Sequence, residues 1–305
     1  MSAEEVGSSD GQRIYPGLVG RLLASQFPEW ADLPLRRLYP AGSDNVIYRL
    51  GENMSVRLPR GDWAAGQAAK EHYWLPRLAP RLPLPIPVPL GVGKPAFGYP
   101  WDWSVWRWLP GETATVQGLA NPRRTARELA EFLTALQYAL PVDSDAPSPH
   151  DEVTGVPLAR RDRATRAAIA AVQDTFDAPA MTAVWDAALR APAWDRGPVW
   201  FHGDVHLGNL LVSDGQLSAV IDFAGLGVGD PACDLVIAWN LLSPQTRPVF
   251  RAALQVDDAT WIRAQGWALT TGLNAYTSYA ATDPLVAANT HRQISQVLID
   301  RARTS

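Results

Sequence analysis

One segment in the second half of the chain constrains the fold more than any other. It runs HGDVHLGN from His202 to Asn209, continues through two strand-like runs and ends at Asp222. The letters SDGQ at 213–216 separate the two runs and predict the turn of a β-hairpin. A hairpin of this length returns the chain to its starting point, so we expect Asp222 to lie beside Asn209.

The side chains at these positions have the chemistry that phosphoryl transfer requires. A carboxylate in a loop, here Asp204, can orient an attacking hydroxyl and accept its proton. Mg²⁺ prefers hard oxygen ligands that leave positions for phosphate and water. Asn209 offers a carbonyl oxygen and Asp222 a carboxylate. We therefore predict Asp204 as the catalytic base, and Asn209 and Asp222 as ligands of Mg²⁺.

The same segment has other interpretations. The two aspartates could simply cap turns, with Asn209 an ordinary loop residue. His202, Asp204 and His206 could instead bind a metal ion, as in a metallohydrolase, but this leaves Asn209 and Asp222 without a role. We expect His202 to support the catalytic loop by hydrogen bonding, the alternative being an ordinary buried histidine.

The first third of the chain predicts a small β-rich region. Apolar residues at helical spacing favour a helix from Gln12 to Gln26. Strand-like runs separated by turn residues predict a β-meander over residues 35–58. A helix over 62–78, with Asp62 as its N-cap, contains Glu71. The proline-rich run LPLPIPVPL favours an extended edge segment, and YPWDWSVWRW favours a further strand.

The remainder of the chain is mainly helical apart from the hairpin. Helical patterns follow one another from Asn121 to Arg190, with a Pro-, Asp- and Ser-rich loop between them, and resume from about Asp230. We therefore predict an α+β fold of two lobes. A small β-rich N-lobe spans residues 1–110, and a larger, mainly helical C-lobe spans residues 111–305.

Composition narrows the classes of protein. Hydrophobic residues make up 47% of the chain and charged residues 19%, as in a globular protein. The formal net charge of −4 argues against a general nucleic-acid-binding protein, which usually has a basic face. No apolar run reaches the roughly 18 residues of a membrane-spanning helix, and the N-terminus does not resemble a secretory signal. With a single cysteine, Cys233, we expect a cytoplasmic protein without nucleic-acid or membrane partners.

These motifs together resemble those of the aminoglycoside phosphotransferase family over about residues 12–300. In the second half the resemblance rests on FHGDVHLGNLLV and VIDFAGLGVGDPACDL, and in the first half on AGSDNVIYRLG, SVRLPRG and WSVWRWLPGE. The resemblance implies a protein-kinase-like fold and transfer of the γ-phosphate of ATP or GTP to a small-molecule hydroxyl. It also implies that Asp230 and Asp234 anchor the helix that follows them. Asp230-Pro231 independently predicts an N-cap with proline at the first helical position.

The resemblance also assigns phosphate binding to the N-lobe. The loop at 42–45 would close over the phosphates, and Ser43 offers a hydroxyl there. The third strand usually carries a lysine that grips the phosphates and pairs with a helix glutamate, but this chain has Arg57 there, with Glu71 as partner. Arginine is not equivalent to lysine at a tight site. Either the pocket is shaped around Arg57, or the chain is an inactive nucleotide-binding homologue; the intact hairpin segment favours activity.

The nucleotide base is expected at the hinge between the lobes. The resemblance places it against the backbone of Trp106, Arg107 and Trp108, with Glu112 near the ribose. Tryptophans in a strand usually pack in a core. We therefore expect backbone atoms of Trp106 and Trp108, and not their indole rings, to contact the base.

The acceptor is expected between Asp204 and the C-lobe helices. Acidic candidates for binding a cationic acceptor are Asp151, Glu152, Asp162 and Asp230, and each of them also has a structural interpretation. Aromatic and small residues dominate the last helices, which suits a macrolide, a peptide antibiotic or a metabolite equally well. Phosphorylation of an antibiotic is the leading hypothesis, and a metabolic kinase for a sugar or amino alcohol is the alternative.

Overall fold

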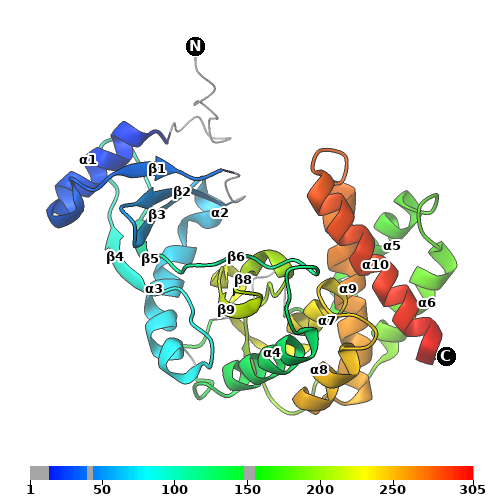
Figure 1. Cartoon of the computed structure of the whole chain (residues 1–305). Helices are drawn as coiled ribbons and strands as arrows, with labels where there is room; N and C mark the ends of the chain where they lie inside the picture. The colour runs from blue at the N-terminus through cyan, green and yellow to red at the C-terminus, as the bar shows by residue number, and fades with distance from the viewer. Residues whose placement is uncertain (1–13, 40–43, 144, 148–154, 305) are drawn as a thin grey trace. The chain divides into compact units, whose positions relative to one another are not determined.

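The computed structural model describes residues 14–39, 44–143, 145–147 and 155–304. These residues form two compact units. One comprises the chain up to Pro80 together with Pro85–Pro110, and the other comprises Arg81–Leu84 together with the chain from Gly111 onward. The first unit is built on an antiparallel sheet and the second mainly on helices (Figure 1). The predicted α+β fold is confirmed.

The sheet of the first unit has five antiparallel strands in the order β1-β2-β3-β5-β4. The strands are β1 (Leu35–Arg37), β2 (Asn45–Leu50), β3 (Met54–Pro59), β4 (Pro89–Gly93) and β5 (Trp103–Arg107). The predicted meander is therefore present. The proline-rich run leads into β4 at the sheet edge, where a residue without an N–H donor does not interrupt a ladder on both sides.

Helix α1 (Pro16–Gln26) packs its apolar stripe on this sheet. The buried residues of the stripe are Leu18, Val19, Leu22 and Leu23. They share one core with alternate residues of β2 and β3, namely Val46, Tyr48, Leu50, Val56 and Leu58. The predicted helix start, Gln12, lies outside the described residues. The described helix begins at Pro16, because proline with its fixed φ and missing N–H suits the first helical turn.

The single helix predicted over 62–78 is divided at Gly66. Its two parts are α2 (Asp62–Ala65) and α3 (Gln67–Leu78). The prediction of Asp62 as N-cap is wrong, because the cap position is Gly61. The Asp62 carboxylate instead accepts a hydrogen bond from the Trp101 indole at 2.8 Å, which ties the start of α2 to the sheet core.

The second unit contains most of the helices. They are α4 (Pro122–Gln137), α5 (Asp162–Ala171), α6 (Ala178–Arg190), α7 (Ile237–Asn240), α8 (Arg247–Leu254), α9 (Asp258–Tyr279) and α10 (Pro284–Thr304). Short 3-10 segments join them to the strands; those near the candidate site are η4 (Leu207–Asn209), η5 (Phe223–Gly225) and η6 (Pro231–Val236). Side-chain oxygens of Asn121, Asp177 and Asp257 cap α4, α6 and α9, which explains where these three helices begin.

Two small antiparallel ladders complete the second unit. One has the order β6-β8-β9, and the other pairs β7 with β10. The strands are β6 (Glu112–Thr113), β7 (Val199–Phe201), β8 (Leu210–Ser213), β9 (Gln216–Val220) and β10 (Gly227–Gly229). The predicted hairpin is thus β8–β9. Its two turn residues, Asp214 and Gly215, have φ of +51° and +73°, as the tight turns of hairpins require.

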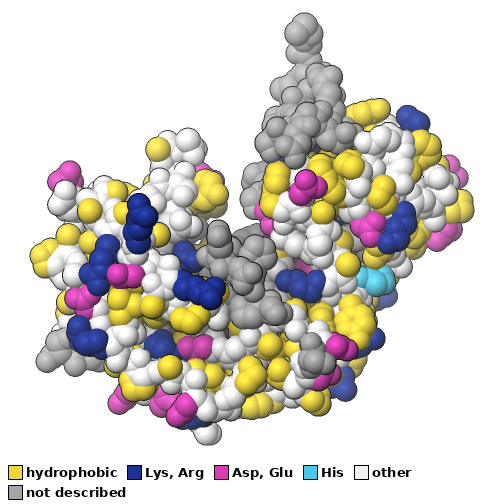
Figure 2. Space-filling model, turned by 180° about the vertical axis from the view of Figure 1, so that it is seen from behind, with side chains coloured by type: hydrophobic (Ala, Val, Ile, Leu, Met, Phe, Trp, Pro, Cys, Tyr) yellow, Lys and Arg dark blue, Asp and Glu magenta, His cyan; other side chains and the backbone are white. Residues whose placement is uncertain are grey.

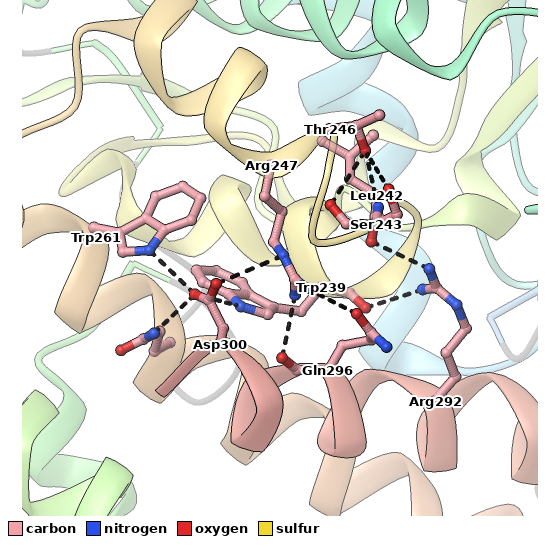
Figure 3. Close-up of polar contacts among 10 residues, drawn as sticks. Trp239, Leu242, Ser243, Thr246, Arg247, Trp261, Arg292, Gln296 and Asp300 are labelled. Carbon is pink, nitrogen blue, oxygen red and sulfur yellow. Dashed lines mark hydrogen bonds and ion pairs between the residues drawn. The ribbon is translucent and has the colours of Figure 1, made fainter. Parts of the chain in front are cut away.

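A buried polar network ties α10 to α7, α8 and α9 (Figure 3). The Oδ2 atom of Asp300 accepts hydrogen bonds from the indoles of Trp239 and Trp261 and from the Gln265 amide, at 3.0–3.4 Å. Its Oδ1 atom lies 3.8 Å from Nε of Arg247, whose side chain is only 2% exposed. One carboxylate therefore compensates a buried guanidinium and joins four helices.

On the side drawn in Figure 2, acidic and basic side chains are interspersed among the described residues. In the part of the chain that the structure describes, no helix is long and apolar enough to cross a membrane.

Replacing Asp300 with leucine is expected to lower the free energy of unfolding by about 3–5 kcal/mol, because buried Arg247 would lose its counter-charge. Replacing Asp186 with alanine is the control. Its carboxylate pairs with Arg166 on the surface at 2.7 Å, so its loss should cost less than about 1 kcal/mol. Urea unfolding measures both values, and equal losses would contradict a dominant role for the α10 network.

Candidate active site

The segment from His202 to Asn209 forms a loop that leaves β7 and ends in η4. The carboxylate of Asp204 projects from it, with its side chain 59% exposed. The amide of Asn209 donates to the Asp204 backbone carbonyl at 2.9 Å and to Asp204 Oδ2 at 3.2 Å. These contacts fix the orientation of the Asn209 amide and direct its nitrogen, rather than its oxygen, toward Asp204.

The hairpin returns the chain to Asn209 as predicted. Beyond the last strand pair, Leu210 with Val220, the Ile221 N–H donates to the Asn209 carbonyl at 2.9 Å. Asp222 follows immediately, so the structure brings Asp204, Asn209 and Asp222 together at the base of the hairpin. No side chain of the described residues donates a hydrogen bond to the Asp222 carboxylate.

Asp222 has an unusual backbone. Its φ and ψ are +64° and +74°, in the left-handed region that a non-glycine residue seldom occupies. Such a conformation costs roughly 1–3 kcal/mol and persists only where the surrounding structure enforces it. Here the hairpin before Asp222 and the buried Phe223 after it supply that constraint.

His202 is completely buried beneath the loop. Its Nδ1 atom accepts the Asp204 N–H at 3.2 Å, and its Nε2 atom donates to the Ile221 carbonyl at 3.0 Å. The ring packs against Phe223, with 4.4 Å between the ring centroids. Burial lowers the pKa of His202, which keeps the ring neutral and consistent with one donating and one accepting nitrogen. These contacts agree with a supporting role.

The alternative metal site, formed by His202, Asp204 and His206, has no support in the geometry. Both ring nitrogens of His202 are bonded to the backbone and cannot face a metal ion. Within the described ranges, no group of three or more His, Cys, Asp or Glu side chains is arranged to hold one. This disfavours a metallohydrolase.

His206 contacts both the loop and Asp204. Its Nδ1 atom accepts the Gly208 N–H at 3.0 Å, and its Nε2 atom lies 3.5 Å from Asp204 Oδ2. Burial lowers the pKa of His206, but the hydrogen bond and negative charge of Asp204 outweigh burial and raise it. The Gly208 contact opposes protonation at Nδ1. Removal from water raises the pKa of Asp204, but the contacts with His206 and Asn209 outweigh this effect and lower it.

One buried carboxylate holds the start of the loop. Asp234, in η6, accepts the N–H groups of His202 and Gly203 at 2.7 Å each, one on each oxygen. Burial raises the pKa of Asp234 to about 7, although the two N–H groups act against the shift. The family resemblance implies that Asp234 anchors the helix that follows it, and its contacts show that it also anchors the loop of residues 202–209. A lone aspartate within the apolar run ACDLVIAW was the available signal, because such a residue needs buried partners.

The loop of residues 202–209 and η5 approach each other closely at two glycines. Gly203 has a φ of +87°, and a Cβ there would overlap the Gly225 carbonyl. A Cβ on Gly225 would lie 3.0 Å from the His202 carbonyl oxygen. Because neither glycine has a side chain, the backbone segments that contain Asp204 and Asp222 can pack closely against each other.

Arg57 and Glu71, predicted as a pair, do contact each other in the first unit. Their side chains are 17% and 6% exposed, and Arg57 Nη1 lies 3.8 Å from Glu71 Oε2. This is a single long ion pair and not the bidentate pair that the planar fork of arginine allows. Ser43, the predicted phosphate-loop hydroxyl, lies outside the described residues.

The hinge tryptophans have different environments. Trp106 is 1% exposed and donates to Ser104 Oγ, so its ring belongs to the core as expected. Trp108 is half-buried under the guanidinium of Arg49, which lies 3.9 Å from the ring centroid. Its backbone N–H donates to the Asn53 carbonyl at 2.8 Å and is therefore already used within the unit. Contacts of Trp106 and Trp108 with a nucleotide base stay a prediction.

The described acidic candidates for acceptor binding are engaged inside the second unit. Asp162 accepts hydrogen bonds from Trp185 and Arg166 at 2.7 and 2.8 Å. Asp230 caps η6 and pairs with Arg263, whose Nε lies 2.7 Å from Asp230 Oδ2. Both aspartates thus have structural partners, as their second interpretation predicts. Asp151 and Glu152 lie outside the described residues.

A cavity of about 550 Å³ lies in the second unit, away from the loop of residues 202–209. Pro198 and Gly229 border it at one end of the β7–β10 ladder, whereas His202 follows the other end of β7. Its walls are mostly apolar and include Leu158 and Trp267. This cavity is therefore separated from Asp204 by the length of the strand.

The two-unit α+β fold, the loop of residues 202–209 and the hairpin that ends at Asp222 are typical of phosphotransferases. Comparison with known proteins identifies the family. Residues 36–269 match the model of the phosphotransferase enzyme family, and the chain belongs to this family. The resemblance stated from the sequence is thereby confirmed.

Individual relatives are more distant. Aminoglycoside 3'-phosphotransferase of Escherichia coli is 39% identical over 59 residues, 19% of this chain and 22% of that protein. The chain thus spans about a fifth of the length of this curated relative. A structure of APH(2")-IIia in complex with GDP and kanamycin superposes with a TM-score of 0.70 and 20% identity, over 94% of this chain and 99% of that one. Macrolide 2'-phosphotransferase MphH of Brachybacterium faecium gives a TM-score of 0.59 and 21% identity, over 91% and 97%.

Replacing Asp234 with asparagine should lower the free energy of unfolding by about 1–3 kcal/mol, because asparagine has one acceptor oxygen for two buried N–H groups. The control is Asp214→Asn in the exposed hairpin turn, where asparagine tolerates a positive φ and little change is expected. Urea unfolding of the two variants provides the comparison. An Asp234→Asn protein as stable as the control variant would mean that the carboxylate is not needed to hold the loop.

Proposed function

We propose that the protein is a kinase that transfers the γ-phosphate of a nucleoside triphosphate to a hydroxyl of a small molecule, and that the acceptor is an antibiotic. The observation that carries the proposal is the grouping of Asp204, Asn209 and Asp222 at the base of one hairpin. Family membership supports the reaction class. The relatives solved with GDP and kanamycin, or named as macrolide phosphotransferases, support the donor and acceptor classes.

Asp204 is the proposed catalytic base. Its Oδ2 atom receives the Asn209 amide and faces His206, while no described group donates to its Oδ1 atom. Oδ1 is therefore available to orient the acceptor hydroxyl. The oxygen of that hydroxyl attacks the γ-phosphorus, the bond to the β-phosphate oxygen breaks, and the proton passes to Asp204. A lowered pKa keeps Asp204 ionised at neutral pH, as this step requires.

Asn209 and Asp222 fit a magnesium ion by their chemistry. The Asn209 nitrogen is used by Asp204, which leaves the amide oxygen for a cation, and the Asp222 carboxylate has no side-chain donor among the described residues. One neutral and one anionic oxygen suit Mg²⁺. When bound, Mg²⁺ neutralises charge on the transferred phosphate. The strained backbone of Asp222 fixes the direction in which its carboxylate is presented.

Arg57, Glu71 and Ser43 are the proposed phosphate-binding residues of the first unit. Glu71 is buried on α3 and holds Arg57 by charge, so the guanidinium keeps a preferred direction even though the ion pair is long. Arginine retains its charge at any physiological pH and binds phosphate well. This argues for a pocket adapted to Arg57, and against the alternative of an inactive homologue. Trp106 and Trp108 are the proposed hinge contacts of the base.

The acceptor proposal favours an antibiotic that is not a dense polycation. Both described acidic candidates, Asp162 and Asp230, already pair with arginines. A polycationic acceptor would need a cluster of carboxylates without such partners. A macrolide hydroxyl therefore fits at least as well as an aminoglycoside hydroxyl, and a sugar or amino alcohol is the alternative acceptor.

The first experiment measures release of nucleoside diphosphate with Mg²⁺ and ATP or GTP, across macrolides, aminoglycosides, peptide antibiotics, sugars and amino alcohols. We expect stimulation by one antibiotic class. Asp204→Asn should lower kcat about 10²–10⁴-fold with nucleotide binding retained, whereas Asp222→Asn should also weaken Mg²⁺-dependent nucleotide binding. Stimulation by a sugar or amino alcohol alone would favour the metabolic alternative. Wild-type turnover by both variants would refute the site assignment.

Arg57→Lys tests whether the pocket is adapted to arginine. Lysine has a single ammonium group in place of the planar fork, so we expect KM for the nucleotide to rise about tenfold or more. Arg124→Lys, on the exposed face of α4 where the arginine pairs with Glu128 at 2.7 Å, is the control, with KM expected within about twofold of the wild-type value. An unchanged KM in Arg57→Lys would mean that arginine is tolerated at this position and not required.

A further inference from the structure

A chain of buried side-chain amides links helix α10 with the catalytic loop. The Leu207 N–H donates to Asn240 Oδ1 at 2.7 Å, and Asn240 Nδ2 donates to Gln293 Oε1 at 2.8 Å. Gln293 Nε2 then donates to the Ala268 carbonyl at 2.7 Å and to Thr271 Oγ1 at 3.1 Å. Asn240 and Gln293 are 5% and 4% exposed, so water cannot readily replace either partner.

The two ends of this chain fix the direction of every bond within it. A backbone N–H such as that of Leu207 can only donate, and a backbone carbonyl such as that of Ala268 can only accept. Turning either amide over would bring two oxygens or two N–H groups face to face. Asn240 and Gln293 therefore each have one permitted orientation, and the chain is specified from α9 to the catalytic loop.

The end of the chain lies where the candidate site needs precision. Leu207 is the first residue of η4, and its N–H would otherwise have no partner within that turn. η4 ends at Asn209, whose N–H donates to the His206 carbonyl at 2.9 Å and whose side chain contacts Asp204. Holding Leu207 thus holds the short turn that carries Asn209.

We propose that Gln293 is a positioning residue for the active site, acting through Asn240 on Leu207 and so on Asn209. Gln293 is some 84 positions beyond Asn209 in the chain, on a helix that the motifs of the catalytic segment do not include. The expected effect of Gln293 on catalysis rests on the proposed kinase function, whereas its expected effect on the Leu207 amide is independent of that function.

Gln296 provides a matched control on the same helix. It is a glutamine one helical turn after Gln293, and it also bonds a buried partner: its Oε1 atom accepts from Arg247 Nη2 at 2.8 Å (Figure 3). Arg247 belongs to α8. Within the described residues, the hydrogen bonds that Gln296 accepts come from Arg247 and do not lead to the candidate catalytic loop. The two glutamines therefore share their chemistry and their helix but differ in what they hold.

The test compares Gln293→Met with Gln296→Met by amide hydrogen exchange at Leu207, by kcat and nucleotide KM, and by Tm. We expect both variants to lose stability. Only Gln293→Met should speed exchange at Leu207 about tenfold and lower kcat at saturating Mg²⁺ by a similar factor, because one hydrogen bond is worth about this much. Asn240→Ala removes the acceptor of the Leu207 N–H itself, so adding Gln293→Met to Asn240→Ala should change exchange at Leu207 and kcat little further, because Gln293 acts through Asn240.

The outcomes distinguish the proposed positioning role of Gln293 from the proposed kinase function. If exchange at Leu207 and kcat in Gln293→Met match those in Gln296→Met, the proposed positioning role of Gln293 is refuted. Faster exchange at Leu207 with kcat unchanged would leave a contact that does not position Asn209, which also overturns the inference. If exchange speeds up as expected and no acceptor stimulates turnover even in the wild-type protein, the hydrogen-bond chain from Gln293 to Leu207 is supported and the proposed kinase function fails.

Discussion

Two backbone N–H groups at the start of the candidate catalytic loop (residues 202–209), those of His202 and Gly203, donate to the buried carboxylate of Asp234. The loop has no regular secondary structure there, so these N–H groups have no partner in a helix or sheet ladder. An unpaired buried N–H costs about 1–3 kcal/mol, and two would be a large part of the stability of an ordinary domain. The carboxylate of Asp234 therefore fixes the position of the loop, and with it the position of Asp204, which follows Gly203 directly.

The other contacts of the site are arranged around this anchor. His202 fastens the loop to the end of β9, Asn209 fastens its far end to Asp204, and Asp222 follows the hairpin in a strained conformation. Each contact fixes the backbone or the side chain of one candidate site residue. The buried polar groups that hold the loop and the hairpin include Asp234, Asn240 and Gln293. They lie on η6, α7 and α10, which follow the hairpin in the chain.

The local parts of this arrangement could be predicted from the sequence. The hairpin follows from two strand-like runs around a short turn, and the grouping of Asn209 with Asp222 follows from its length. The contacts with Asp234 and Gln293 could not be predicted, because they join residues 31 or more positions apart that no periodicity relates. The N-cap at Asp62 was wrong for the same reason: a distant indole takes the carboxylate that local rules assign to the helix.

The close approach of Gly203 and Gly225 has a consequence for how the sequence can vary. A side chain at Gly203 would overlap the Gly225 carbonyl, and a side chain at Gly225 would crowd the His202 carbonyl oxygen at 3.0 Å, so each position limits what the other can become. Neither glycine has a functional group. A scan of random substitutions should nevertheless find both positions among the least tolerant in the chain, and a substitution at one should not be rescued by removing atoms at the other, which has none to remove. The space between the two segments is already at its minimum.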